Sequence, residues 1–147
     1  MHKLERQSDR TIVRGGEYSM PHQFGLDHVS PLVRSLDVST KFYTRVFGFE
    51  PIENGTRMAH IRWFGIGGVD ALHITEGDFE GTLLKKPTHF AVRVANLDGF
   101  VADLRAKGIA FVDWPGAEGK VTARPDGFRQ IYVQDPDGYW IEVNDHS

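Results

Sequence analysis

The sequence predicts an α+β protein in which two tandem βαβββ modules form a curled, eight-stranded mixed sheet around a metal cleft. Three observations lead to this expectation. A strand, a helix and three further strands occur twice in the same order. Several residues recur at the same places in both copies. Histidines and one glutamate fall on matching strands of the two copies, where their side chains are able to converge on one centre.

The repeat is visible as residue identities as well as a hydrophobic pattern. One constant shift along the chain superposes His28 on His89, Val33 on Val94, Leu36 on Leu97, and Asp37 on Asp98. These matches lie in two strand–helix units, each followed by three strands, so chance is a poor explanation. Each module is too small to bury its sheet alone, and the two should therefore share a core. We expect an N-terminal arm over residues 1–23 and one domain over 24–147, with modules at about 24–80 and 85–147.

The first module begins with a strand over residues 26–33. Asp37 then caps a helix that carries apolar residues on one side and ends at Gly48, where a left-handed glycine belongs. Three strand-like stretches follow at 49–53, 58–64 and 70–75. Asn54-Gly55 between the first two is typical of a hairpin turn.

The second module repeats this plan. Residues 89–94 form a strand, Asp98 caps a helix, and Gly108 ends it. Strands are predicted at 109–113, 129–134 and 139–144.

Composition excludes several functional classes. The 147 residues carry a formal net charge of −3, and their basic residues are scattered among acidic ones, so nucleic acid is not an expected partner. No apolar run approaches the length of a membrane helix. The first ten residues have no apolar core, so we expect no secretory signal. The chain has no cysteine, which removes thiolate ligands and is compatible with the cytoplasmic location that we predict.

Four residues are candidate ligands for one divalent cation. His28 and His89 lie in the first strand of each module, and His73 and Glu142 lie in the last. Three imidazoles and one carboxylate suit Zn, Ni, Co, Mn or Fe(II), and leave positions for water or substrate. A single strand histidine is more often structural than a ligand, but the equivalent placement favours ligation. Whether the site forms within one chain or across a dimer stays open.

Two segments resemble proteins of the vicinal oxygen chelate superfamily, which includes glyoxalases, bleomycin resistance proteins and extradiol dioxygenases. LDHVSPLVRSLDVSTKFYTRVFGFE resembles their opening, with a ligand on the first strand and Phe-Tyr in the first helix. QIYVQDPDGYWIEV is similar to their closing segment, in which Asp-Pro-Asp-Gly forms the last turn and a metal-binding glutamate follows. The resemblance covers residues 24–145.

This resemblance implies roles for individual residues. His28, His89 and Glu142 match metal ligands of the superfamily, and His73 stands where glyoxalase I has glutamate. Tyr132 matches a substrate-facing tyrosine, and Gln130 should share its strand face. Arg124 and Arg129 lie on or near the loop that enters this strand, where a substrate carboxylate or phosphate would be held. Tyr132, Arg124 and Arg129 each also have a purely structural interpretation.

The function expected from the resemblance is a divalent-metal-dependent lyase or isomerase of the glyoxalase type, acting on a small oxygen-chelating substrate. Glu142 is the candidate base, and Tyr132 is the second catalytic candidate. The alternatives are an extradiol-type dioxygenase and a non-catalytic, antibiotic-resistance-type binding protein. Residues 121–128 lack the acid–base histidine that ring-cleaving relatives carry, which argues against the dioxygenase. A homodimer is expected, because sheet edges need covering.

Overall fold

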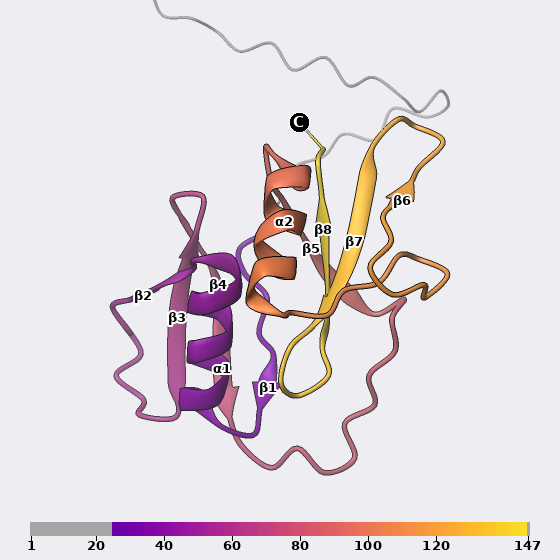
Figure 1. Ribbon diagram of the computed structural model, residues 1–147. Helices are drawn as coiled ribbons and strands as arrows, with labels where there is room; N and C mark the ends of the chain where they lie inside the picture. Colours follow the sequence, from indigo (N-terminus) through magenta and orange to yellow (C-terminus); the bar gives the residue numbers. More distant parts are fainter. Residues whose placement is uncertain (1–24, 147) are drawn as a thin grey trace, which may run out of the picture.

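Each half of the chain forms its own four-stranded sheet in the computed structural model, which describes residues 25–146 (Figure 1). The first module contains β1 (Leu32–Val33), α1 (Leu36–Phe42), a π-helical turn η1 (Tyr43–Phe47), β2 (Glu50–Ile52), β3 (Ile61–Ile66) and β4 (Val69–Glu76). The second contains β5 (His89–Arg93), α2 (Leu97–Lys107), β6 (Thr122–Ala123), β7 (Arg129–Gln134) and β8 (Trp140–Asn144). The predicted arm at residues 1–23 lies outside the described range.

The two sheets have the same topology. Their strand orders are β1-β4-β3-β2 and β5-β8-β7-β6. In each, the first strand runs parallel to the last, and the remaining neighbours are antiparallel. The predicted α+β class and the repeated βαβββ order are therefore confirmed.

The predicted eight-stranded sheet is not what the structure shows, because within residues 25–146 no ladder joins β1 to β5. Part of the reason lies at the edge of the first sheet. Pro31 has no backbone N–H to offer, and the N–H of Leu32 donates to the hydroxyl of Tyr139 at 3.1 Å. The side chain of Tyr139, in the second module, thus occupies the hydrogen-bonding position that a neighbouring strand would need.

Other strand predictions need correction as well. The strand predicted at 26–33 is reduced to β1 and one parallel bridge between Val29 and Leu72. The strand predicted at 109–113 is represented by isolated bridges of Val112, and β6 was not predicted. Asn54 does not form a two-residue hairpin; its side chain donates to the carbonyls of Met58 and Ile61 and holds a wider loop.

Both helices begin two residues earlier than the sequence pattern indicates. Ser35 caps α1 by accepting the N–H of Val38 at 3.3 Å, and Asn96 caps α2 by accepting the N–H of Gly99 at 2.9 Å. Asp37 and Asp98, predicted as caps, instead lie in the first turns, where a carboxylate faces the positive end of the helix dipole. Both helical segments end as predicted, at glycines in the left-handed conformation.

The corrected cap makes a testable prediction. Ser35→Ala should lower the free energy of unfolding by about 1 kcal/mol, because an orphan N–H of α1 loses its acceptor. Asp37→Ala should cost only about 0.5 kcal/mol, since it loses a dipole interaction and a 3.5 Å ion pair with Arg62, both at an exposed position. Urea unfolding of both variants measures the difference. A larger loss for Asp37→Ala than for Ser35→Ala would restore the original assignment.

The modules pack together through their helices. One buried cluster contains Leu36 and Val46 of the first module together with Leu97 and Val101 of the second. The rings of Phe47 and Phe100 stack with centroids 5.8 Å apart. In Figure 1, α1 and α2 lie next to each other on the same side of the two sheets.

The turn between β7 and β8 contributes polar contacts to this packing. Asp135 accepts the hydroxyl hydrogen of Tyr43 at 2.8 Å, and Asp137 pairs with Arg34 at 3.1 Å. The Asp-Pro-Asp-Gly turn of the second module is therefore anchored on the first. Among the described helices, none has the length and apolar character needed to cross a membrane.

Candidate metal centre

His28 and His73 form a pair on one sheet because of its parallel register. Val29 pairs with Leu72, His28 comes one residue before this pair, and His73 one residue after it. The N–H of His73 donates to the carbonyl of Val29 at 3.1 Å, which fixes the register. Leu72 and Ile74 are fully buried in the core, so the alternation of a strand directs His73 to the face opposite the helix. The two imidazole centroids are 4.6 Å apart.

Trp63 completes an aromatic cluster around this pair. It lies directly across from His73 in the β3–β4 ladder, and its ring is 4.5 Å from that of His73 and 5.1 Å from that of His28. Partial burial, followed by the charge of His28, lowers the pKa of His73. A lowered pKa keeps the imidazole neutral, which is the form that binds a metal.

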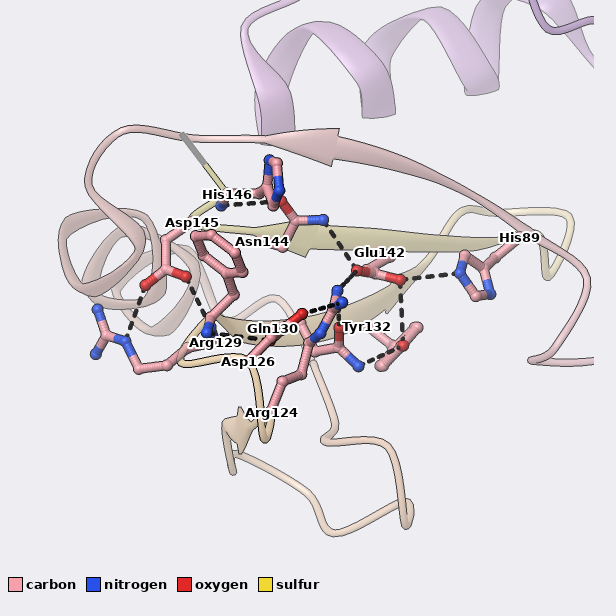
Figure 2. Close-up of polar contacts among 11 residues, drawn as sticks. His89, Arg124, Asp126, Arg129, Gln130, Tyr132, Glu142, Asn144, Asp145 and His146 are labelled. Carbon is pink, nitrogen blue, oxygen red and sulfur yellow. Dashed lines mark hydrogen bonds and ion pairs between the residues drawn. The ribbon is translucent and has the colours of Figure 1, made fainter. Parts of the chain in front are cut away.

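His89 and Glu142 form the equivalent pair on the second sheet. Phe90 pairs with Ile141, His89 comes one residue before this pair, and Glu142 one residue after it. His89 Nε2 lies 2.9 Å from Glu142 Oε2 (Figure 2). The two sheets therefore place one candidate ligand pair each at matching positions, as the sequence repeat predicts.

Glu142 is only 7% exposed, and a network of polar groups holds it. Tyr132 donates its hydroxyl hydrogen to Oε2 at 3.3 Å, and Asn144 donates to Oε1 at 2.9 Å. Gln130 donates to the Tyr132 oxygen at 2.8 Å, and Arg124 lies 4.0 Å from Oε1. Burial, followed by the charge of Glu142, raises the pKa of Tyr132 to about 12. Tyr132 is therefore a neutral hydrogen-bond donor across the physiological pH range.

A pocket of about 400 Å³ opens onto this second pair. Its lining residues are His89, Trp114, Thr122, Ala123, Arg124, Pro125, Gln130, Tyr132 and Glu142. The pocket thus brings a carboxylate, a phenol, an amide and a guanidinium together with aromatic and aliphatic surface. This composition is typical of sites for small polar molecules.

The hydrogen bonds of the three histidines suit metal ligation. Nδ1 of His28 contacts the Asp27 carboxylate, Nδ1 of His73 contacts Ser30 Oγ at 3.2 Å, and Nδ1 of His89 contacts the Lys86 carbonyl at 2.7 Å. A metal-binding imidazole usually has its second nitrogen bonded in this way, which orients the ring and fixes its tautomer. In all three, Nε2 would be the nitrogen that binds a cation, and in His89 this nitrogen faces Glu142 Oε2 at 2.9 Å.

The described residues of one chain do not gather three such donors at one point. His28 and His73 are together, His89 and Glu142 are together, and the two pairs are separate. The donor chemistry fits a divalent cation, but a complete site needs one pair to meet the other. Both pairs lie on the sheet faces opposite the core, because their strand neighbours Leu72, Ile74, Ile141 and Val143 are buried.

Arg129 lies away from the pocket. Its Nε donates to Asp145 at 3.0 Å, and its NH1 donates to Asp98 at 2.9 Å. The hydrogen bond to Asp98, followed by that to Asp145, raises the pKa of Arg129. It therefore links β7 to the start of α2 and the end of β8, and we do not assign it to substrate binding.

Three residues near the pairs were not identified from sequence as site residues. Asn144 is two residues after Glu142 on the same strand face, and this spacing was an available indication. Trp63 had no indication except its place in a strand. Lys86 lies in the linker between the modules, and its ammonium donates to the carbonyls of Asp113 and Trp114 at 3.0 and 2.9 Å. The Lys86 carbonyl also accepts from His89 Nδ1. Lys86 therefore connects the loop that carries Trp114 to His89.

Comparison with known proteins identifies the family. Residues 25–143 match the family model described as Glyoxalase/Bleomycin resistance protein/Dioxygenase superfamily. The chain belongs to this superfamily. Its resemblance to vicinal oxygen chelate proteins at the opening and closing segments is thereby confirmed.

Individual relatives have different described activities. The chain is 28% identical to Metallothiol transferase FosB of Shouchella clausii over 123 residues, covering 82% of this chain and 79% of that protein. It is 30% identical to Glyoxylase I 4 of Arabidopsis thaliana over 128 residues, covering 83% and 71%. The crystal structure of the fosfomycin resistance protein FosX from Listeria monocytogenes superposes with a TM-score of 0.67 at 22% identity, covering 86% of this chain and 96% of that one. This last likeness supports the fold alone.

Proposed function

We propose that the protein is a divalent-metal-dependent lyase or isomerase of the glyoxalase type, acting on a small substrate with neighbouring oxygens. One observation carries the proposal. His28 and His73 on one sheet, and His89 and Glu142 on the other, occupy equivalent register positions, and each histidine has Nδ1 bonded. A structural histidine has no reason to follow this repeat.

When bound, the cation would supply a Lewis acid that polarises a substrate carbonyl or hydroxyl oxygen. His28, His73, His89 and Glu142 are the residues that would hold it. The chain's own groups account for the remaining chemistry. Glu142 is the candidate base, because it is the one carboxylate that lines the pocket beside His89. Tyr132, protonated at neutral pH, would donate a hydrogen bond to a substrate oxygen or to Glu142.

Arg124 and Gln130 are the proposed substrate-binding residues. Both line the pocket, and Arg124 NH1 donates to Gln130 Oε1 at 3.4 Å. Arg124 also pairs with Asp126, so its guanidinium is held at the pocket rim. A substrate carboxylate or phosphate would find its cationic partner there.

We further propose that the site is completed in a homodimer, the first pair of one copy meeting the second pair of the other. The buried side chains that flank the pairs support this: Leu72 and Ile74 on β4, and Ile141 and Val143 on β8, face the core, so both pairs lie on the opposite faces of their sheets.

A fosfomycin-modifying transferase is the second candidate. The similarity to FosB supports it, together with Arg124 in the pocket, since a guanidinium suits an anionic antibiotic. Two assays separate the candidates: consumption of the thiohemiacetal of methylglyoxal, and conversion of fosfomycin in the presence of a thiol. An extradiol dioxygenase is disfavoured by the absence of histidine in residues 121–128.

Metal binding by Glu142→Gln tests the shared premise. We expect the variant to bind Zn, Ni, Co or Mn more than about 100-fold more weakly, since outer partners of a ligand alone are worth 10–100-fold. Three neutral imidazoles also leave the dication without a compensating charge. Equilibrium dialysis with wild type and with Glu80→Gln, an exposed carboxylate, provides the comparison. Equal metal content in Glu142→Gln and wild type would disprove the proposed site.

A further inference from the structure

The two carboxylate oxygens of Glu142 have different partners (Figure 2). Oε1 accepts a hydrogen bond from Asn144 Nδ2 at 2.9 Å. Oε2 lies 2.9 Å from His89 Nε2 and accepts from the Tyr132 hydroxyl at 3.3 Å. Of the two oxygens, Oε2 is therefore the one that faces His89, the histidine of the same pair.

The orientation of the Asn144 amide is fixed by groups that have only one hydrogen-bonding role. The backbone N–H of His146 can only donate, and it donates to Asn144 Oδ1 at 3.2 Å. The Glu142 carboxylate can only accept, so Nδ2 must face it. A flipped amide would place an oxygen against the carboxylate and a nitrogen against an N–H, and both contacts would be lost.

A chain of hydrogen bonds leads to Oε2, and its first member, Arg124, also lies 4.0 Å from Oε1. Arg124 donates to Gln130 Oε1, Gln130 Nε2 donates to the Tyr132 oxygen, and Tyr132 donates to Oε2. Gln130 and Tyr132 are buried, so their orientations are determined by these bonds. Unlike Tyr132, which lines the pocket, Asn144 is absent from its lining and reaches it only through Glu142.

We propose that Asn144 is a positioning residue that keeps Oε1 of Glu142 occupied, so that Glu142 offers a bound cation one oxygen instead of two. The inference rests on the proposed metal site and deepens it. A carboxylate that binds through both oxygens would use an additional coordination position. Holding Oε1 back leaves this position for a second substrate oxygen, which a chelating substrate requires.

The test uses Zn²⁺ alone and infrared difference spectra of metal-loaded minus metal-free protein. The separation between the antisymmetric and symmetric carboxylate stretches is wide for one-oxygen binding and narrow for two-oxygen binding. Wild type should show the wide separation, and Asn144→Leu the narrow one. Gln134→Leu is the matched control and should match wild type, since within residues 25–146 this β7 amide donates only to the carbonyl of Gly138.

Different outcomes separate the two proposals. If wild type takes up no Zn²⁺, the proposed metal site fails. If wild type binds Zn²⁺ with a narrow separation, or if Asn144→Leu keeps the wide one, only the role of Asn144 is overturned. A purely structural role would lower the thermal midpoint of Asn144→Leu without changing the separation. Should Asn144→Leu not fold, Asn144→Ala replaces it in the comparison with wild type. A narrow separation in Asn144→Ala would support the role of Asn144, and a wide one would overturn it.

Discussion

Asp135→Ala is expected to lower the free energy of unfolding by about 3 kcal/mol, because it leaves three donors without their acceptor. Asp135 Oδ2 accepts from the Tyr43 hydroxyl at 2.8 Å, and Oδ1 accepts from the N–H groups of Asp137 and Tyr139 at 3.0 and 2.9 Å. Tyr43 is fully buried between the modules, so its hydroxyl has no access to water. Chemical denaturation monitored by tryptophan fluorescence measures the loss.

Asp135→Asn is the matched comparison, since an amide retains all three hydrogen bonds. Its oxygen accepts from the two turn N–H groups, and its nitrogen donates to the Tyr43 oxygen. We expect this variant to be within about 1 kcal/mol of wild type. A loss for Asp135→Asn as large as that for Asp135→Ala would show that the charge, and not the hydrogen bonds, stabilises the turn.

The pH dependence distinguishes these contributions further. Burial raises the pKa of Asp135 above its ordinary value, although the hydrogen bonds from Tyr43 and the turn oppose the rise. A raised folded-state pKa means that the folded protein binds the proton more tightly, so this group's contribution to stability falls as pH rises through that pKa. Asp135→Asn lacks this dependence. The stability of Asp135→Asn relative to wild type should therefore increase from acidic to neutral pH.

Local pattern was sufficient to predict the repeated strand–helix order and the equivalent register of the candidate ligand pairs. Strand alternation and the repeat placed His73 and Glu142 at equivalent positions. Each of these two positions is determined by the strand register within a single sheet. The helix caps were misplaced because Ser35 and Asp37, and likewise Asn96 and Asp98, are all capping residue types. Propensity alone does not choose between two such residues two positions apart.

The relation between the pairs depended on contacts that local pattern does not encode. Tyr43 with Asp135 and Phe47 with Phe100 join residues far apart in the sequence, and they determine which faces of the sheets are covered. Arg124 and Arg129 were equivalent candidates for substrate binding, because the sequence does not show which distant residues each one contacts. Their roles diverge only because Asp98 and Asp145 pair with Arg129, while Arg124 faces Glu142.

Complementation between two inactive chains should reveal how the pairs meet. One chain carries His28→Ala and His73→Ala, and the other carries His89→Ala and Glu142→Ala. If each site combines the first pair of one copy with the second pair of the other, neither homodimer has a complete site. Their heterodimer has one complete site and one empty one, and should bind about half as much metal per chain as wild type.

The measurement requires two affinity tags, co-refolding and purification of the heterodimer, followed by metal analysis after dialysis against Zn²⁺. The control is a heterodimer in which both differently tagged chains carry His89→Ala and Glu142→Ala, and it should bind no metal tightly. The intrachain alternative gives an opposite result. There every chain of the mixed heterodimer lacks one pair of its own site, so mixing restores nothing. Metal-free heterodimers alongside fully loaded wild type would show that the two pairs of one chain meet each other.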